Sequence, residues 1–429
     1  MVTEFRDALA DTERLSPGEM ASYQRNLLLP LLKHARLHAP FYEDRLAPIF
    51  DGETPDLSRW NDIPVLTRGE AQSAAEALTS TYLPPHCGEV TNEETSGSTG
   101  IPFRHLRNDL MNVANIALTD RMFRWWQLDG NRTMASFTSR RKHRAPPPDG
   151  ATLQGWRTGF DAAHYLIDMW ADTDIQIDWL LARKPAYLTA YSSTLLALAE
   201  RSRQRGVDLK FESIVSNATA ISDEIRDVCE TVLGARPHDH YGAQEVGSIA
   251  AECPTCGHYH INAETVLVEI LRDDGTSCAP GESGRVVVTS LYNYAMPFIR
   301  YEIGDYAVRG PETVKCQIQL PTLSRVLGRY RNTFTLPDGR IVYPYVEIAR
   351  FRDYIPFTQV QVVQTDYDAI EVRYVAVDDK APDEEGLQIY LREAIHPELR
   401  VKAISVADIP RSPSGKFEDF LSLVPRLRS

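Results

Sequence analysis

Apolar side chains recur at helical spacing through the first half of the chain. Ser16 followed by Pro17 and Glu19 is a typical helix start, and leucines then gather on one side of a mostly helical stretch from Ser16 to Arg45. Pro30 should kink or interrupt that stretch, because proline removes a backbone donor. The same spacing predicts further helices over residues 70–80, 107–128, 171–184 and 191–205.

Short apolar runs alternate with the later helices, over residues 186–189, 213–216 and 237–241. Strands separated by helices normally pair in parallel, so these runs predict an α/β core with a mainly parallel sheet. Between residues 264 and 290, apolar side chains occupy every second position around a turn at 273–275, which is typical of strands.

The chain after Arg329 supplies a second, smaller set of elements. A strand, a Pro337–Gly339 turn and another strand come first, and strands over 358–364 and 369–377 with a helix over 383–395 follow. We therefore expect an α/β protein in two parts. The large N-terminal part, residues 1–328, would hold mixed sheets with packed helices, and the small C-terminal part, residues 329–429, would be an α+β domain.

Composition and charge exclude several classes of protein. The chain has 429 residues, of which 43% are hydrophobic and 24% charged, as in ordinary globular proteins. A net charge of -13 would repel nucleic acid over most of the surface, so no nucleic-acid partner is expected. No apolar stretch approaches the ~20 residues of a membrane span, and the acidic N-terminus is unlike a signal peptide. We expect a cytoplasmic protein, without a membrane partner, whose six cysteines remain thiols.

Four short motifs combine residues suited to nucleotide chemistry. The first, Glu94–Pro102, interleaves glycines with small hydroxyl residues, so that backbone N–H groups can surround phosphate oxygens. In the second, His240–Glu245, an aromatic ring can stack on a purine and a carboxylate can hold Mg²⁺. In the third, Ile299–Asp305, an aspartate can accept both ribose hydroxyls. In the fourth, Arg411–Lys416, a lysine can bring positive charge to a phosphate. Each motif alone also has an ordinary interpretation: a linker, a surface glutamate, a Gly-Asp turn or a basic tail.

A cysteine–histidine segment resembles a metal-binding knuckle. Cys253 and Cys256 are separated by two residues, so their thiolates can chelate one tetrahedral ion, and His258 or His260 could supply a third ligand. The alternative is two buried thiols beside surface histidines. The cysteines at 87, 229 and 278 have no partners by spacing, which favours small buried apolar residues.

The order and spacing of the four motifs resemble the adenylate-forming superfamily, and within it the phenylacetate–coenzyme A ligase family. Flanking segments add to the resemblance: Glu13–Ser16, His38–Tyr42 and Thr289–Tyr301. The resemblance implies ATP- and Mg²⁺-dependent activation of a carboxylic acid to its acyl-AMP, followed by capture of the acyl group by coenzyme A. It also implies that the small domain is a lid and that the chain can form a homodimer.

The resemblance assigns roles to individual residues. The phosphate loop would be Thr95, Ser96, Gly97, Ser98, Thr99 and Gly100, and the nucleotide pocket would include Ser216, Asn217, Ala218, His240, Tyr241, Gly242 and Ala243. Glu245 would hold Mg²⁺, Asp305 would bind the ribose, and Arg329 and Lys416 would act with Glu245 in catalysis. A structural Zn²⁺ would be held by Cys253, Cys256, His260 and Cys316, pinning the loop after Glu245 to the base of the small domain.

Three departures from the family pattern leave the substrates open. Ile101 stands where the phosphate loop usually continues with lysine. Asn332 stands at the usual aspartate hinge, and residues 335–341 look like a tight hairpin where a glycine-rich segment is usual. The acyl acceptor could therefore be coenzyme A, an amine or a carrier-protein thiol, and a catalytically idle binding protein is a remote third hypothesis. The acid, aryl or another small acid, could lie among Phe137, Trp156 and Phe160, although such residues are more often core.

Overall fold

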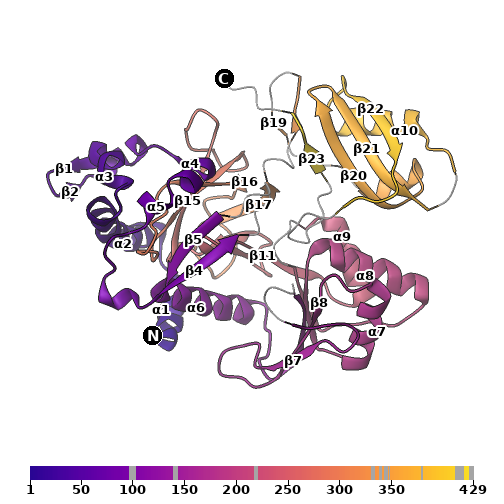
Figure 1. The fold of residues 1–429 in the computed structure, drawn as a ribbon, viewed down its shortest axis with the longest axis horizontal. Helices are drawn as coiled ribbons and strands as arrows, with labels where there is room; N and C mark the ends of the chain where they lie inside the picture. Colours follow the sequence, from indigo (N-terminus) through magenta and orange to yellow (C-terminus); the bar gives the residue numbers. More distant parts are fainter. Residues whose placement is uncertain are drawn as a thin grey trace. The chain divides into compact units, whose positions relative to one another are not determined.

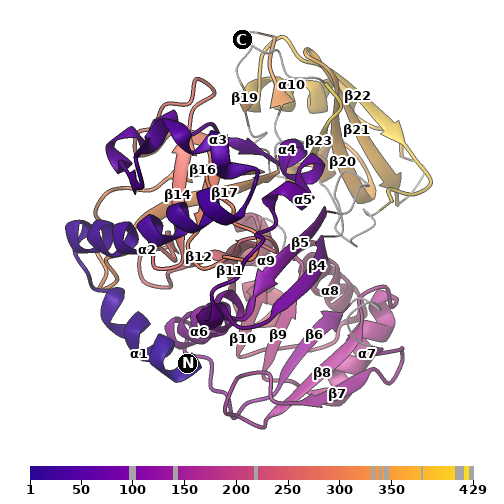
Figure 2. The same cartoon turned by 60° about the vertical axis from the view of Figure 1, so that its left-hand side comes forward.

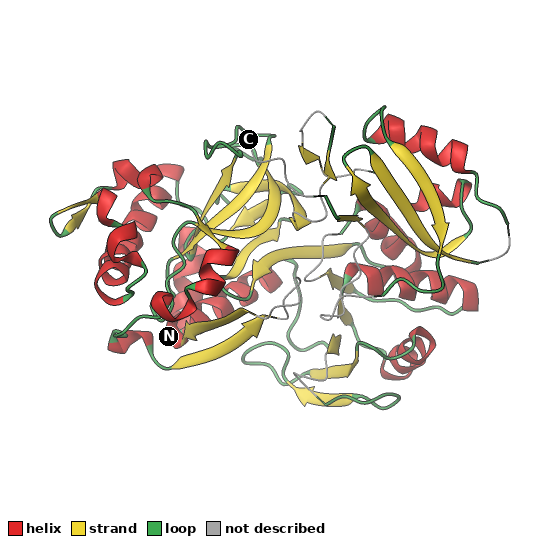
Figure 3. Ribbon diagram, turned by 45° about the horizontal axis from the view of Figure 1, so that its top comes forward, coloured by secondary structure: helices red, strands yellow, loops and turns green. Residues whose placement is uncertain are grey.

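The computed structural model describes residues 1–95, 103–138, 144–216, 221–329, 334–337, 341–342, 346, 348–377, 380–410 and 420–424. The chain divides into two compact units. The larger comprises Met1–Ile221 and Ile225–Val326, and the smaller comprises Leu327–Ser429 with Ser222–Glu224. Both units mix helices with strands (Figures 1 and 3). The protein is therefore an α/β protein with a large mixed sheet.

The helices of the larger unit follow the predicted pattern closely. Ser16 and Glu19 form the expected capping box at the start of the second helix. Pro30 lies inside that helix without ending it, because the buried face around Leu31 and Leu32 packs into the core and offsets the missing hydrogen bond. The predicted helix over 70–80 is two short helices. The helices are α1 Val2–Thr12, α2 Pro17–His38, α3 Tyr42–Arg45, α4 Arg68–Ser73, α5 Ala75–Leu78, α6 Asp109–Trp125, α7 Thr173–Arg183, α8 Ser192–Arg205 and α9 Asp223–Leu233, with 3₁₀ turns η1 Ala47–Ile49, η2 Leu57–Asp62 and η3 Pro85–Cys87.

One 13-stranded sheet runs through the larger unit in the order β14-β15-β16-β17-β13-β12-β11-β10-β9-β6-β8-β7, with β3 paired to β16. Strands β11, β10, β9, β6 and β8 pair in parallel, which confirms the predicted parallel core. The strands of this sheet are β3 Leu66–Thr67, β6 Met134–Thr138, β7 Ala151–Gln154, β8 Ala163–Asp168, β9 Tyr187–Ala190, β10 Ser213–Ser216, β11 Pro237–Ala243, β12 Gly247–Glu252, β13 Tyr259–Ile261, β14 Val266–Leu271, β15 Ser283–Ser290, β16 Tyr301–Arg309 and β17 Thr322–Arg329.

Two small antiparallel pairs complete the larger unit: β1 Phe50–Asp51 with β2 Thr54–Pro55, and β4 Val90–Thr95 with β5 Phe103–Asn108. Figure 2 shows β10, β9, β6, β8 and β7 side by side. Alternate side chains of these strands form two cores. Ile214, Leu188 and Ile167 pack with α7, α8 and α9, whereas Val215 and Tyr187 belong to the main core with α6.

The smaller unit has its own sheet and core. Its strands are ordered β22-β21-β20-β23. The turn predicted around Pro337 joins the paired strands Phe334–Thr335 and Ile341–Val342, so the hairpin is confirmed for the residues on either side of 338–340. Its elements are β18 Phe334–Thr335, β19 Ile341–Val342, η5 Ile348–Asp353, β20 Phe357–Asp366, β21 Ala369–Ala376, α10 Glu384–Ala394, β22 Arg400–Ser405 and β23 Phe420–Ser422. In the described part of the chain, no helix has the length and apolar character needed to cross a membrane.

Candidate active site and cysteine–histidine cluster

Glu245 lies in a tight turn that joins β11 to β12. The two strands are antiparallel, and Ala243 pairs with Gly247 across the turn. Gly247 has a φ of +85°, and a Cβ atom there would approach Oδ1 of Asn115 to 2.3 Å. Only glycine fits this position, because the backbone is left-handed and α6 is already in contact. The turn between β11 and β12 thereby fixes the position of the Glu245 carboxylate just beyond the end of β11.

The side chain of Glu245 is only 3% exposed and is held by two partners. Arg68 forms an ion pair with it at 2.7 Å, and the hydroxyl of Tyr301 donates a hydrogen bond to the same oxygen, Oε1, at 3.0 Å. Burial, reinforced by the neighbouring carboxylate, raises the pKa of Tyr301 well above its ordinary value, so the phenol keeps its proton. The buried carboxylate therefore lies between a guanidinium and a phenol that keeps its proton.

Arg68 is a site residue that the sequence did not indicate, because it lies 177 residues before Glu245. The short strand β3 brings it there: Leu66 pairs in parallel with Tyr301 on β16. A capping box between Thr67 and Glu70 then starts α4 with Arg68 as its first residue. The capping pattern Thr-X-X-Glu is visible in the sequence, but it reports a helix start and not a partner for Glu245.

Asp305 on β16 faces Tyr241 on β11. The hydroxyl of Tyr241 donates to Oδ2 of Asp305 at 2.9 Å, and both side chains are buried. Gly304 has a φ of +85°, a conformation that L residues rarely adopt, so glycine is needed immediately before the aspartate. Thus β16 brings Tyr301 to Glu245 and Asp305 to Tyr241, and two of the predicted motifs meet across the sheet.

The glycine–hydroxyl motif begins at the end of the β4–β5 hairpin. Thr95 pairs with Phe103 across the two strands, so the ends of the intervening segment are held together. The guanidinium of Arg68 lies 5.6 Å from the centre of the Phe103 ring. The arginine that pairs with Glu245 therefore also contacts the β4–β5 hairpin, at Phe103, the residue opposite Thr95.

Several predicted site residues lie outside the described part of the chain. These are Ser96, Gly97, Ser98, Thr99, Gly100, Asn217, Ala218 and Lys416, while Thr95 and Arg329 are described by their backbone alone. Ser216 ends β10 and is paired with Asp239 of β11. The ring of His240 hydrogen bonds to the Ser216 backbone, and burial lowers the pKa of this histidine. The segment His240–Ala243 thus adjoins Ser216, and the nucleotide-pocket role of these residues stays a prediction.

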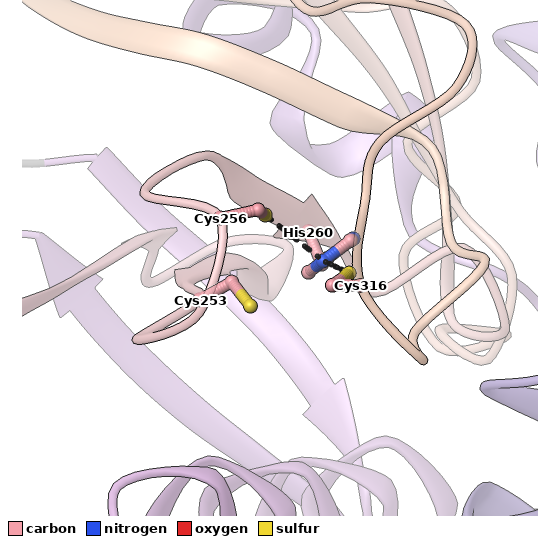
Figure 4. A group of neighbouring side chains, drawn as sticks. All are labelled: Cys253, Cys256, His260 and Cys316. Carbon is pink, nitrogen blue, oxygen red and sulfur yellow. Dashed lines mark hydrogen bonds between the residues drawn. The ribbon is translucent and has the colours of Figure 1, made fainter.

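Cys253, Cys256, His260 and Cys316 converge at the other end of β12 (Figure 4). Their ligand atoms all lie within 4.8 Å of one another. A tight turn forms the first half of the cluster: the backbone N–H of Gly257 donates to the carbonyl of Cys253 at 2.9 Å. Cys316 comes from the loop between β16 and β17. Two sequence-distant loops are therefore joined at a set of three sulfurs and one nitrogen, which suits a tetrahedral metal ion.

His260 is oriented as a metal ligand. Its Nδ1 lies 3.1 Å from the carbonyl of Leu320, while Nε2 lies 3.2 Å from the sulfur of Cys316 and 3.7 Å from that of Cys256. Nδ1–H donates to the carbonyl, so Nε2 carries the free lone pair that faces the sulfurs, as in many metal sites. The geometry therefore selects His260 over His258, which the sequence left open.

The thiols of the cluster differ in acidity from one another. Burial opposes ionisation of Cys253, but its hydrogen bonds with His260 and with the backbone of Cys256 and Thr255 outweigh burial and lower the pKa to about 6, whereas burial raises the pKa of Cys256 to about 12 and also raises that of Cys316. Burial raises the pKa of Cys87 to about 11 and that of Cys229 to about 12. Cys87, Cys229 and Cys278 are all fully buried, which confirms the prediction that they are core residues.

The aromatic residues considered for the acid pocket have packing partners. Trp156 makes T-shaped contacts with Phe123 and Tyr187, and its indole N–H donates to the carbonyl of Arg132. Phe137 packs against the core beneath α7 and α8. Phe137 and Trp156 thus pack against the two cores of the larger unit, and a role of Phe137, Trp156 and Phe160 in acid binding stays a prediction.

Comparison with known proteins shows what the chain is similar to in sequence and in fold. No protein-family model matches the chain. It is 26% identical over 390 residues to phenylacetate–coenzyme A ligase of Escherichia coli strain K12, covering 84% of this chain and 83% of that protein. The fold is similar to 2-hydroxyisobutyryl-CoA ligase in the postadenylation state with 2-HIB-AMP, at a TM-score of 0.71 and 15% identity over 95% of this chain and 90% of that one. An amide bond synthetase from Marinactinospora thermotolerans gives a TM-score of 0.51 and 16% identity over 76% and 67%.

The fold is therefore shared with adenylate-forming ligases. In sequence, the chain is similar to the phenylacetate–coenzyme A ligases over most of its length.

Proposed function

We propose that the protein is an AMP-forming acid–thiol ligase. It activates an aryl or other small carboxylic acid with ATP, releases pyrophosphate, and transfers the acyl group from the acyl-AMP to coenzyme A. The observation that carries this proposal is that β16 supplies both Tyr301, which donates to Glu245, and Asp305, which accepts from Tyr241, in a chain similar to coenzyme A ligases over most of its length.

The protein's part in the first step is positioning and charge compensation. A carboxylate is already a nucleophile, so the barrier is dominated by bringing two anions together in line. Asp305 would bind the ribose hydroxyls, and the residues of the loop from Thr95 to Gly100 would surround the phosphates. Ser216, Asn217 and Ala218 would line the nucleotide with Tyr241, Gly242 and Ala243, while Arg329 and Lys416 would offset negative charge at the reacting phosphate.

Glu245 suits a magnesium ligand. Mg²⁺ is usually bound by one or two carboxylates together with substrate phosphates and waters. Glu245 offers one buried carboxylate, and its partner Arg68 contacts the β4–β5 hairpin, which leads into the proposed phosphate loop. When bound, Mg²⁺ would neutralise part of the negative charge of the ATP phosphates. Arg68 forms an ion pair with this carboxylate, so a bound ion would replace part of the contact between the guanidinium and Oε1.

The cysteine–histidine cluster suits a structural Zn²⁺. Three thiolates and one imidazole complete a tetrahedral set, which leaves no position for substrate. Such an ion would fasten the loop between β16 and β17 to the turn after β12. We assign this site to stability and not to the chemical step.

The direct test is pyrophosphate exchange with a panel of aryl and small acids, followed by product analysis with coenzyme A. We expect acid-dependent exchange and a coenzyme A thioester. Absence of exchange with every acid would favour an inactive binding protein on the same fold. Cytoplasmic location and a homodimer belong to the same proposal, and size-exclusion chromatography checks the latter.

An amine acceptor is the second candidate. The similarity to an amide bond synthetase and the hairpin β18–β19 in place of a glycine-rich segment favour it. A carrier-protein thiol is a third acceptor of the same acyl-AMP. Because exchange precedes acceptor capture in all three cases, only the product made with coenzyme A, candidate amines or a carrier protein separates them.

A further inference from the structure

Arg300 stands at a strained point of the chain, directly before β16. Its φ is +48°, in the left-handed region that residues other than glycine rarely adopt. The residue is only 3% exposed. Its backbone N–H donates to Oγ1 of Thr289 at 2.9 Å, and its carbonyl accepts from the N–H of Leu66 at 2.8 Å. Strained residues persist where surrounding contacts hold them, and they gather at functional sites.

The guanidinium of Arg300 binds two different parts of the chain. Nε and Nη2 form a fork with the carboxylate of Glu269 on β14, at 3.2 and 2.9 Å. Nη1 faces the end of η2, where it donates to the carbonyl of Ile63 at 2.7 Å and to that of Asn61 at 3.2 Å. The ion pair with Glu269 would compensate the buried charge by itself. The additional carbonyl contacts attach the segment that runs from η2 into β3.

That segment leads directly to Arg68. Leu66, whose N–H binds the Arg300 carbonyl, pairs with Tyr301 where β3 meets β16. Arg68 follows two residues later and forms its ion pair with Glu245 at 2.7 Å. Tyr301, the residue after Arg300, donates to the same oxygen of Glu245 at 3.0 Å. Both partners of the carboxylate are therefore attached to the chain next to Arg300.

The pairing of β3 with β16 is too short to fix Arg68 by itself. Strand β3 has two residues, fewer than an ordinary strand, and therefore few backbone hydrogen bonds. Side-chain contacts must supply the rest. Arg45 of α3 donates to this segment at the Val65 carbonyl, at 2.8 Å, but this contact ties the segment to α3. Arg300 ties it to β16, the strand that carries Tyr301.

We propose that Arg300 is a positioning residue of the active site, whose left-handed backbone and buried guanidinium fix β3 on β16 and thereby hold Arg68 against Glu245. This inference rests on the proposed adenylation function and adds to it a residue that acts through others. Loosening Arg300 should let Arg68 move, and the carboxylate with it. Small displacements of positioned groups cost large factors in rate, even when the substitution lies away from the reacting atoms.

The test is a double-variant cycle in pyrophosphate exchange, built from Arg300→Lys and Arg68→Met. Lysine keeps a positive charge beside Glu269, but its single ammonium cannot also reach the Ile63 carbonyl. Arg300→Lys should therefore lower kcat by roughly 10-fold or more. Because both variants disturb one arrangement, the double variant should stay within about threefold of the Arg68→Met protein. Losses that multiply in the double variant would overturn the inference, and so would an Arg300→Lys protein with wild-type kinetics.

Deuterium uptake by backbone amides measures the attachment of β3 without catalysis. In Arg300→Lys, peptides covering residues 57–68 should take up deuterium roughly 10-fold faster or more, while those of α6 keep their protection. Arg121→Lys is the matched control, because it weakens another buried ion pair, with Glu264, on α6. It should lower the unfolding midpoint but leave residues 57–68 protected, and its effect on rate should multiply with that of Arg68→Met. Unaltered uptake in Arg300→Lys, or the same pattern in Arg121→Lys, would refute the inference.

Glu269→Gln covers the case in which Arg300→Lys does not fold. The amide keeps the shape of the side chain and one acceptor, so we expect the same non-additivity with Arg68→Met and a smaller loss of rate, and multiplied losses would again contradict the inference. A wild-type protein without pyrophosphate exchange for any acid would count against the adenylation function instead. The cycle is then measured as the Kd for MgATP by calorimetry, beside deuterium uptake. Changes in Kd that multiply, or unaltered uptake over residues 57–68, would refute the inference, and non-additive changes with faster uptake would support it.

Discussion

The two ends of strand β12 hold charged groups in contrasting ways. Before the strand, Glu245 is balanced by Arg68 and Tyr301, which the protein supplies itself. After the strand, three sulfurs and the Nε2 of His260 point at a common centre. At Glu245, a bound Mg²⁺ could replace Arg68 as the partner of the carboxylate. At the cluster, four protein ligands would fill every position of a tetrahedral ion. The same strand thus connects the proposed active-site carboxylate with the proposed metal site.

The difference lies in the chemistry of the ligands. A carboxylate shared between an arginine and a phenol keeps its charge and can release either partner, because each contact is a single hydrogen bond. Thiolates and imidazole together form strong, geometrically fixed bonds to a soft ion. We therefore expect substitutions before β12 to affect the reaction, and those after it to affect folding.

Glu245→Gln should have the largest effect. The amide keeps the shape of the side chain but loses the charge that faces Arg68 and Mg²⁺. We expect pyrophosphate exchange to fall by ~10²-fold or more, as for loss of one preorganised electrostatic group. Steady-state exchange across a Mg²⁺ titration measures the loss. Asp174→Asn, which opens the exposed ion pairs with Arg201 and Arg205, is the control and should change neither the exchange rate nor, to any large extent, the unfolding midpoint. A Glu245→Gln protein with normal exchange would contradict the assignment.

Removal of metal from the cluster should act on stability. Cys253→Ser, or dialysis against a strong chelator, should lower the unfolding midpoint by roughly 5–10 °C, because metal binding is linked to folding. Elemental analysis should find one zinc per chain in the wild type and none in the variant. Cys229→Ala removes a buried thiol outside the cluster and should leave the metal content unchanged. Equal metal content in the Cys253 and Cys229 variants would refute the zinc site.

Tyr301→Phe should have an intermediate effect on the reaction. It deletes the 3.0 Å hydrogen bond to Oε1 of Glu245 without altering the packing of the ring. A hydrogen bond to a charged group is worth about 1.5–3 kcal/mol, so exchange should fall by about tenfold or somewhat more. The KM for MgATP should rise with it, and unaltered kinetics would mean that Glu245 does not depend on this phenol.

Tyr241→Phe should have the smallest effect. The change removes the donor to Asp305, but Asp305 keeps other interactions. We expect a rise of about three- to fivefold in the KM for ATP with kcat nearly constant, because one neutral donor is lost from a carboxylate that stays ordered. A large fall in kcat instead would place Tyr241 at the reacting atoms and not at the ribose.

The sequence by itself determined most of the helices, though not α1 or α9, together with the parallel core and the cysteine pair suited to metal. Apolar periodicity located α8, β10 and α10 nearly to the residue, and the spacing of Cys253 and Cys256 indicated chelation before any fold was known. These features depend on local pattern, which a linear chain carries in full.

Tertiary structure decided which side chains meet. Arg68 reaches Glu245 because the two-residue strand β3 pairs with β16, and no local pattern encodes that pairing. The choice of His260 over His258 follows from the carbonyl of Leu320, and the two faces of β11 separate His240 from Tyr241. Contacts between residues far apart in the chain arise from sheet register and packing, so they become visible only when the chain is folded.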